Sequence, residues 1–418
     1  MLFLGDDWSE ERHDLALIDE DGRVLVERRV TEDVDGVAAV HEMVAEAGAP
    51  DPGGVVVGIE TDRGLLVRAL VSSGYQVFAV NPRSVDRYRD RHRVSGAKSD
   101  RSDARVLANL VRTDRAAHRP VRGDSDVVEA VRLLARCHQG LIWARQRHLN
   151  QVRTALREFY PGALAAFGTD LAHPDAVAVL SAAPTPSAAR KLTDARIARL
   201  LRAAGRQRRI NRRATEIGQA MRVEALATPP VVTDAYGATV AAGLGVISEL
   251  TRRIVALEEQ LADRFEQHPD AELLHRLPGL GVVLGARVLA EFGDDPERYP
   301  TVRNRKNYAG AAPITRQSGR RASVHARFVR NRRLADALHQ WAFCSLTTSP
   351  GARAYYDTLR SRGIGHSAAL RQLANRWVGI LHGVLRHRVA YNEYTAWGHH
   401  LPDSYKDQRE NERSVLAA

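Results

Sequence analysis

The feature that most constrains this chain is an uninterrupted apolar run that ends on a carboxylate. Residues 55–59, with the sequence VVVGI, follow a Pro-Gly-Gly turn and lead directly into Glu60. A β-branched run of this kind is typical of a strand buried on both faces, which requires helices above and below a sheet. The sequence therefore predicts a layered α/β fold, in which functional side chains gather at the carboxyl ends of strands.

The residues before and after this run support the same architecture. Apolar residues 2–5 lead into the acidic pair Asp6 and Asp7, and residues 15–18 and 24–26 flank an acidic turn that ends in glycine, as in a β-hairpin. Helical patterns cover about residues 34–47 and 64–72, and residues 76–80 read as a further strand. We thus expect strands alternating with helices, with an acidic pair at the end of the first strand.

Residues 98–105, with the sequence KSDRSDAR, carry two aspartates three residues apart at a predicted helix start. Ser99 or Asp100 could cap this helix, and Asp100 and Asp103 would share one of its faces. Two like charges on one face repel unless a cation lies between them. The alternative is an ordinary acidic first turn, which the helix dipole favours.

Asp7, Glu60, Asp100 and Asp103 are all expected at strand ends or on the first turn of a following helix. Four carboxylates in a small cleft cannot all stay ionised without cations. Hard oxygen ligands favour Mg²⁺ or Mn²⁺ over zinc, and a pair of such ions can hold both the attacking and the leaving oxygen of a phosphodiester. Asp6 is an alternative to Asp7. The order of these elements resembles the RNase H-like, RuvC-type nuclease fold.

The charge of the chain agrees with a nucleic-acid partner. The 418 residues include 61 lysines and arginines against 50 acidic residues, a formal charge of +11. Arginine suits bidentate phosphate contacts, although a biased genome would also enrich it. The length allows two or three domains, and we expect no membrane partner. The two cysteines, Cys137 and Cys344, are expected as buried thiols in a reducing cytoplasm.

The middle of the chain is predicted to be helical. A long helical pattern covers about residues 125–160, and apolar residues from Ile247 to Leu261 recur at the spacing of a two-helix or coiled-coil contact, or of an ordinary buried helix face. A basic run at residues 202–213 is interpreted as phosphate-contacting, with a solvated helix face as the alternative. Its arginines are Arg206, Arg208, Arg209, Arg212 and Arg213.

Ser318 and Gly319 lie in a basic loop near the C-terminal end of the chain, together with Arg316, Arg320 and Arg321. Ser318 could be a plain turn residue beside a glycine of positive φ. It could also be an exposed nucleophile, whose neighbouring arginines stabilise charge on an attacked phosphate. Spacing alone favours the turn.

A family resemblance bears on these alternatives. Residues 5–8 (GDDW), 58–61 (GIET) and 98–104 (KSDRSDA) resemble the DEDD motifs of transposases of the insertion-sequence one-ten family. Residues 277–281 (LPGLG) and 308–319 resemble that family's C-terminal domain. The resemblance implies an α/β RNase H-like (RuvC-like) domain at residues 1–120, a helical coiled-coil region at 121–268, a mostly helical C-terminal transposase domain at 269–400, and a tail at 401–418.

The resemblance also implies an activity, namely RNA-guided cutting and rejoining of DNA. The implied metal ligands are Asp7, Glu60, Asp100 and Asp103, and the implied nucleophile is Ser318. A structured bridge RNA would pair with donor and target DNA, and dimers would assemble into a tetramer in which one site combines residues of different protomers. The expected location is the bacterial cytoplasm, on the nucleoid.

The sequence differs from the family pattern at two places, and three other functions are alternatives. Gln317 stands where the family often has a second serine, and the segment before Asn331 lacks the usual glycine. A metal-dependent, junction-resolving nuclease would use water, with Ser318 as a turn residue only. A non-catalytic nucleic-acid-binding scaffold would bind no metal. An actin-like sugar kinase shares the opening strand order, but no glycine-rich phosphate loop supports it.

Overall fold

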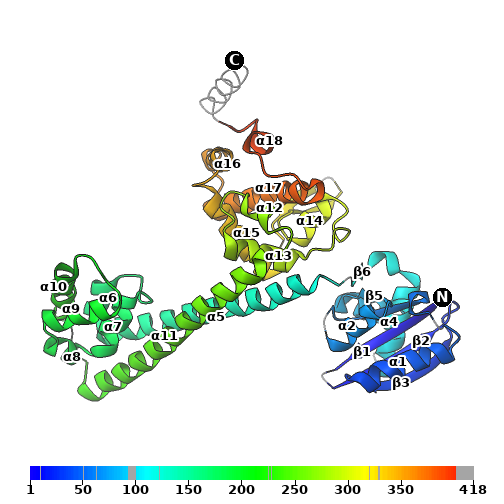
Figure 1. Ribbon diagram of the computed structural model, residues 1–418, viewed down its shortest axis with the longest axis horizontal. Helices are drawn as coiled ribbons and strands as arrows, with labels where there is room; N and C mark the ends of the chain where they lie inside the picture. Colours follow the sequence, from blue (N-terminus) through cyan, green and yellow to red (C-terminus); the bar gives the residue numbers. More distant parts are fainter. Residues whose placement is uncertain are drawn as a thin grey trace. The chain divides into compact units, whose positions relative to one another are not determined.

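The computed structural model describes residues 1–9, 11–49, 51–62, 64–92, 100–121, 123–224, 226, 228–319, 321–327 and 330–401, without the side chains of Arg91, His92, Asp100 and Arg119. The chain divides into two compact units, residues 1–125 and 126–418. The first is a sheet covered by helices, and the described part of the second is helical apart from one hairpin (Figure 1).

The sheet of the first unit is mixed, with strand order β3-β2-β1-β4-β5-β6. β1 runs parallel to β4 and β4 parallel to β5, whereas the other neighbours pair antiparallel. The expected strands are therefore confirmed, and the short β6 was not predicted. The strands are β1 (Leu2–Trp8), β2 (Arg12–Ile18), β3 (Val24–Thr31), β4 (Val55–Ile59), β5 (Gln76–Ala79) and β6 (Arg119–Pro120).

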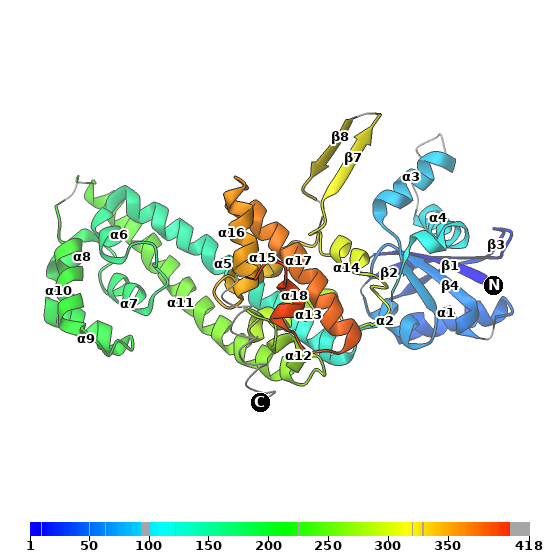
Figure 2. The ribbon, with the colours of Figure 1, turned by 90° about the horizontal axis from the view of Figure 1, so that it is seen from above.

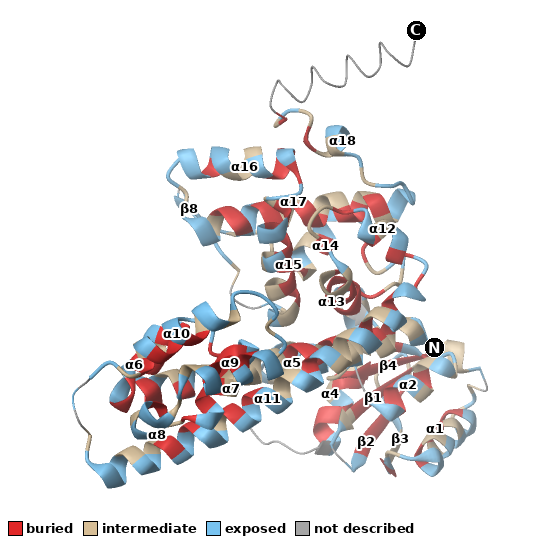
Figure 3. Cartoon of the chain, turned by 60° about the vertical axis from the view of Figure 1, so that its left-hand side comes forward, coloured by how far each residue is buried: buried red, intermediate tan, exposed pale blue. Residues whose placement is uncertain are grey.

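Helices cover both faces of this sheet, as the buried run at residues 55–59 requires. On one face, α1 (Val34–Glu46) and α2 (Leu65–Ser72) pack against the side chains of Leu4, Val57 and their neighbours. On the other, α3 (Pro82–His92) and α4 (Asp100–Thr113) pack against Phe3 and Val56. The central strands are consequently among the most buried parts of the unit (Figure 3). Two short 3-10 turns, η1 (Pro52–Gly54) and η2 (Arg115–Ala117), complete the unit.

Two glycines set how closely α4 approaches the sheet. A Cβ on Gly5 of β1 would lie 1.8 Å from the carbonyl oxygen of Ala104, and one on Gly58 of β4 would lie 2.7 Å from that of Leu107. Because no side chain intervenes at either position, the backbone of α4 rests directly on β1 and β4. The N-terminal turn of α4 is thereby held against the carboxyl-terminal half of β1.

The second unit is organised on two long helices, α5 (Asp126–Phe159) and α11 (Pro230–Glu266), which pack side by side (Figures 1 and 2). One core joins them to five short helices, and a separate core joins them to the remaining ones. The five are α6 (Pro161–Phe167), α7 (Pro174–Ala182), α8 (Pro186–Lys191), α9 (Asp194–Ala203) and α10 (Ile210–Met221). The others are α12 (Ala271–His275), α13 (Val282–Phe292), α14 (Val302–Tyr308), α15 (Arg332–Ser345), α16 (Pro350–Ser361), α17 (His366–His387) and α18 (Glu393–Trp397).

The seam expected in α11 is a buried contact. Ile247, Ile254 and Leu261 are seven residues apart and almost fully buried. Polar contacts also join the two long helices, since His138 Nε2 lies 3.0 Å from Glu258 Oε1. By length and composition alone α11 would be long and apolar enough to cross a membrane, a test that core helices of soluble proteins also pass.

The LPGLG turn before α13 packs inside the second unit. Gly279 has φ +76°, and a Cβ there would lie 2.5 Å from the backbone nitrogen of Ser345 at the end of α15. The indole Nε1 of Trp341 donates to the carbonyl oxygen of Pro278 at 2.9 Å. This close contact with α15 explains why a glycine is needed at this position.

The prediction that both cysteines are buried is wrong. Cys137 of α5 and Cys344 of α15 are free thiols with exposed side chains.

Candidate active site

The first question is which of the two neighbouring aspartates of β1 belongs to a site. Side chains alternate between the faces of a strand, so Leu4 and Asp6 share the α1–α2 face, whereas Gly5 and Asp7 share the α4 face. Asp6 is fully buried, and its Oδ1 lies 2.8 Å from His13 Nδ1. Burial raises the pKa of Asp6, although the hydrogen bond with His13 opposes that rise. Asp6 is therefore engaged within the fold, and Asp7 is the residue on the face that α4 covers.

Glu60 follows β4 on that same face. The last paired residues of the parallel strands β1 and β4 are Asp6 and Ile59. Continued by one residue, it sets Asp7 beside Glu60. Ile59 belongs to the core under α1 and α2, so alternation gives Glu60 the α4 side. Both side chains are half-buried, at the carboxyl ends of neighbouring parallel strands.

Asp103 comes to this face from α4. It is buried, in the first turn of the helix, next to the Ala104 carbonyl that rests on Gly5. Its Oδ1 accepts a hydrogen bond from Arg89 Nη2 of α3 at 2.7 Å, and this arginine is itself largely buried. The sequence did not reveal this partner.

Asp100 is the first residue of α4, one turn before Asp103, and its side chain lies outside the described residues. Residues 93–99, including Lys98 and the predicted cap Ser99, also lie outside the described residues. Among the described side chains, no three metal-binding groups lie close enough to form a metal site.

The donor set nevertheless fits a hard divalent cation. Asp7, Glu60 and Asp103 offer only carboxylate oxygens and belong to one face of the sheet, where α4 touches β1 and β4. Arg89 at present neutralises Asp103, so a metal ion bound there would compete with a guanidinium for the same carboxylate. The local structure thus already provides a positive charge at the position where the carboxylates require one.

Ser318 lies in the second unit, in a hairpin of β7 (Ile314–Ser318) and β8 (Arg321–His325). It is the last paired residue of β7, opposite Arg321, and Gly319, which follows it, has φ +57°. Ser318, Arg316 and Arg321 are exposed, and the hairpin extends away from the helices of its unit (Figure 2). Arg320 lies outside the described residues.

Ser323 offers a comparison within the same hairpin. It pairs with Arg316, and its hydroxyl lies 2.8 Å from His325 Nε2. Ser318 stands beside the turn glycine, whereas Ser323 lies in the middle of β8. The exposed hydroxyl of Ser318 is compatible with both interpretations of that residue, a turn position and a nucleophile.

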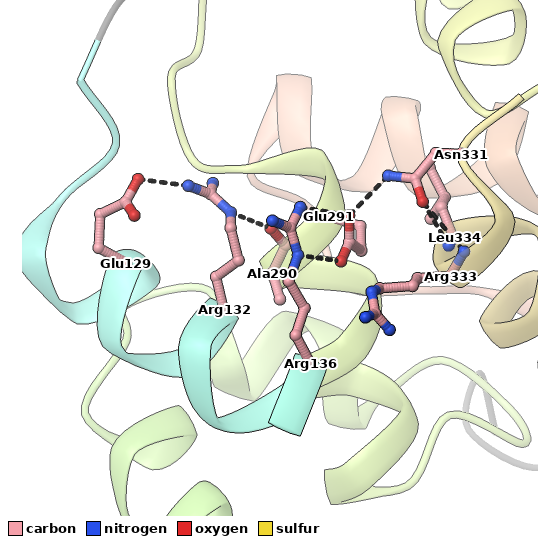
Figure 4. A network of polar contacts seen from close by, with 8 residues as sticks. All are labelled: Glu129, Arg132, Arg136, Ala290, Glu291, Asn331, Arg333 and Leu334. Carbon is pink, nitrogen blue, oxygen red and sulfur yellow. Dashed lines mark hydrogen bonds and ion pairs between the residues drawn. The ribbon is translucent and has the colours of Figure 1, made fainter. Parts of the chain in front are cut away.

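The chain that returns from the hairpin is fixed by a buried polar network (Figure 4). Asn331 caps α15, because its Oδ1 accepts from the backbone nitrogens of Arg333 and Leu334. Its Nδ2 donates to Glu291 Oε2 at 2.6 Å, and Arg136 of α5 binds both oxygens of Glu291 at 2.8 and 2.9 Å. Burial would raise the pKa of Glu291, but the hydrogen bonds from Arg136 and Asn331 lower it below its ordinary value.

The basic run at residues 202–213 divides into two groups. Arg206 binds the buried Asp175 at 2.6 Å, Arg212 binds Glu216, and Arg213 donates to the carbonyl oxygen of Ala166. Arg206 and Arg213 thus connect neighbouring short helices, whereas the Arg212–Glu216 pair is an exposed contact within α10. Arg208 and Arg209 are exposed and form no ion pair with any described residue. The sequence could not separate the groups, because the partners of Arg206 and Arg213 lie more than 30 residues away in the chain.

Two family models match the chain. One, described as "Transposase", matches residues 4–161, and the other, described as "Transposase IS116/IS110/IS902 family", matches residues 271–357. They cover both the carboxylates of the first unit and Ser318 in the second.

Whole-length relatives agree with these matches. A mini-circle protein of Streptomyces coelicolor, named as a transposase for IS117, is 45% identical over 95% of this chain and 96% of its own. The 42 kDa protein of insertion element IS900 from Mycobacterium paratuberculosis is 29% identical over 94% of this chain and 98% of its own. The 44.8 kDa protein of insertion element IS116 from Streptomyces clavuligerus is 30% identical over 92% of this chain and 94% of its own.

Proposed function

Because the chain belongs to the IS116/IS110/IS902 family of transposases, enzymes that cut and rejoin DNA, we propose that it transfers DNA strands with a carboxylate site and a serine nucleophile. The carboxylates are Asp7, Glu60, Asp100 and Asp103, and the nucleophile is Ser318. The parallel register of β1 and β4 supports this proposal most, because its continuation by one residue sets Asp7 next to Glu60 on the face that α4 covers. Asp6, the alternative, is occupied by His13 on the opposite face.

We propose further that the first unit is an RNase H-like domain. A central strand flanked by an antiparallel hairpin on one side and parallel strands on the other supports this assignment. The proposed division keeps residues 1–120 as that domain, 121–268 as a helical coiled-coil region, 269–400 as the C-terminal transposase domain and 401–418 as a tail. The pairing of α5 with α11 supports the coiled-coil part.

The proposed cofactor is Mg²⁺ or Mn²⁺. When bound by these carboxylates, it would supply Lewis-acid stabilisation of charge on a phosphodiester. The protein itself orients Asp7 and Glu60 at the ends of two strands and Asp103 in a helix turn. Before a metal ion binds, the guanidinium of Arg89 neutralises the carboxylate of Asp103.

In the proposed reaction the Ser318 Oγ attacks phosphorus, and the Oγ–P bond forms as the bond from phosphorus to one sugar oxygen breaks. The hydroxyl proton leaves Ser318 and the departing sugar oxygen gains a proton, so charge and atoms balance. A hydroxyl of a second strand then displaces the serine by the reverse of this step. Arg316 and Arg321, exposed on the same hairpin, can stabilise charge on the attacked phosphate.

We extend the proposal to the partners that the family likeness implies. They are donor and target DNA, a structured bridge RNA, and a homo-oligomer in which dimers form a tetramer, acting in the bacterial cytoplasm on the nucleoid. Sequencing of RNA that co-purifies with the protein tests the RNA part. The expected RNA comes from noncoding DNA beside the reading frame and can pair with both DNA partners.

A strand-cleavage assay separates the recombinase from the two alternatives. Glu60→Gln and Ser318→Ala should each abolish cleavage and strand exchange in magnesium. A nuclease that uses water would lose cleavage with Glu60→Gln but keep it with Ser318→Ala. A non-catalytic scaffold would cleave with neither variant nor with the wild-type protein.

A further inference from the structure

Three neighbouring cavities surround the base of the β7–β8 hairpin. The first and third share Gly310, Ala311, Arg330 and Arg371, and the second and third share Arg327 and Asn375. Their volumes are about 330, 600 and 450 Å³. We call the continuous depression that they form the hairpin-base groove, defined by these six residues. It combines the chain that enters the hairpin, the chain that leaves it, and α17.

The groove is strongly positive. Its lining includes six cationic side chains that form no ion pair with a described residue, namely Arg303, Lys306, Arg327, Arg330, Arg332 and Arg371. The single carboxylate among the described lining residues is Asp336. Its Oδ2 already accepts from Arg287 at 2.5 Å and from Gln139 and Gln340 at 2.9 Å each. The groove therefore offers a set of cations that the protein does not neutralise.

Two buried polar atoms in the groove have no partner in the described structure. They are Arg327 Nε, a donor, and Asn375 Oδ1, an acceptor. Buried polar atoms are nearly always hydrogen-bonded, so an unpaired donor on a cation indicates a missing acceptor. The pKa of His339 is lowered by burial and by the positive charges of His366, Arg371 and Arg330. A bound anion would offset this positive potential.

The shape of the groove is fixed by a close backbone contact. Gly310 has φ +66°, and a Cβ there would lie 2.4 Å from the Cβ of Arg330. The entering and leaving chains are thus held together at this point, and the Asn331–Glu291 contact anchors the residue that follows Arg330. An anion would enter a site that is already formed, which keeps the entropic cost of binding low.

We propose that the hairpin-base groove binds a backbone phosphate of a nucleic-acid strand through Arg327, Arg330 and Arg371. The inference rests on the proposed function, in which Ser318 attacks a phosphodiester at the hairpin tip. From Ile314 to Ser318 β7 rises ~13 Å, which corresponds to about four base steps of one strand. The phosphate in the groove is consequently a different one from the phosphate that is attacked, and it sets the register of the strand on the hairpin.

The test measures binding of fluorescent 20-nucleotide probes, single-stranded DNA and RNA of one sequence, to full-length protein over a range of salt concentrations. The double variant Arg330→Ala and Arg371→Ala should bind at least one probe about a hundredfold more weakly. Its salt slope should fall by about one, because the two arginines contact a single phosphate. Replacing both arginines with lysine should restore most of the slope. An effect on DNA alone or on RNA alone identifies the strand, and an effect on both shows that the phosphate chemistry is shared.

Two controls keep this test independent of catalysis. Arg353→Ala removes a cation that is already paired with Asp357 at 2.8 Å on α16, and should bind like the wild-type protein. Ser318→Ala should also keep full binding. Weak binding by the arginine variants would support phosphate binding in the groove even if wild-type protein never forms a DNA adduct. In that case only the proposed role of Ser318 as nucleophile would be wrong. If the double variant bound both probes with unchanged affinity and salt slope, the proposal that the groove binds a phosphate would be wrong.

Discussion

Arg89 Nη2 lies 2.7 Å from Asp103 Oδ1, so a guanidinium from α3 neutralises a carboxylate that the proposed metal site needs. Removal of this cation should free Asp103 and make the site more negative. We expect Arg89→Leu to lower the magnesium concentration for half-maximal strand cleavage by about tenfold, since a charged hydrogen bond contributes ~1.5 kcal/mol or more. A magnesium titration of cleavage measures this shift.

Arg87→Leu is the matched control, because Arg87 is on the same helix and exposed. It should leave the magnesium requirement unchanged. A higher requirement in Arg89→Leu than in the wild-type protein would mean that Arg89 orients Asp103 for the metal rather than competing with it.

Substitution of the two aspartates of β1 should have different effects, on cleavage for Asp7 and on stability for Asp6. Asp7→Asn removes a proposed ligand charge from a half-buried position, and should reduce cleavage by more than about a hundredfold with little change in melting temperature. Asp6→Asn replaces a buried carboxylate that contacts His13, and should cost about 1–3 kcal/mol of unfolding free energy. Cleavage assays and thermal unfolding of both variants check this. Loss of cleavage in a fully stable Asp6→Asn protein would reverse the assignment.

The Glu291 network should make the stability of the second unit depend on pH. Hydrogen bonds from Arg136 and Asn331 hold the pKa of Glu291 below its ordinary value of 4.5. A carboxylate whose pKa is depressed by folding stabilises the protein above that ordinary value, and this stabilisation is lost as pH falls through the folded-state pKa. Glu291→Gln should therefore lower the unfolding free energy by about 1.5–3 kcal/mol at pH 7, and by less near pH 4.

Denaturant unfolding at several pH values measures that difference. Glu272→Gln serves as the control, since Glu272 of α12 forms only an exposed ion pair with Arg276, the residue that follows this helix, and such a pair contributes little. An equal loss at pH 7 and pH 4 in Glu291→Gln would mean that the charge of Glu291 is not what stabilises the unit.

The basic run should separate into binding and structural arginines. Arg208→Glu with Arg209→Glu should weaken binding to DNA and RNA of any sequence and reduce the salt slope by about two. Arg206→Ala should instead lower stability, because it leaves the buried Asp175 without its guanidinium. Binding isotherms at several salt concentrations, with melting curves, distinguish the two effects. An unchanged salt slope in the double variant would make the run a solvated helix face.

Much of the first unit could be predicted from the sequence, because buried strands and amphipathic helices carry local patterns. The choice between Asp6 and Asp7 could not, since it depends on which face of β1 a later helix covers. That contact is decided by Gly5 and Ala104, almost a hundred residues apart. The helix that supplies Arg89 was missed because it carries few apolar residues. Among its described side chains, only Val85 and Tyr88, three residues apart, pack against the core under α4, which is too short a period to recognise.

The second unit shows a similar limit. The long helices and the serine turn could be anticipated from periodicity and from one glycine, and the paired hairpin itself was not foreseen. The hairpin-base groove depends on three segments that meet only after folding, from before β7, after β8 and on α17. Charge alone could not distinguish its unpaired arginines from Arg206, which has a buried partner.

The most direct test of the central claim is mass spectrometry of the protein after a quenched reaction with a DNA substrate in magnesium. Digestion should yield a peptide in which Ser318 carries a nucleotide through a phosphodiester bond, and Ser318→Ala should lose this adduct while Ser323→Ala keeps it. A nucleotide on Ser323, or complete strand cleavage without any protein-bound nucleotide, would contradict the account.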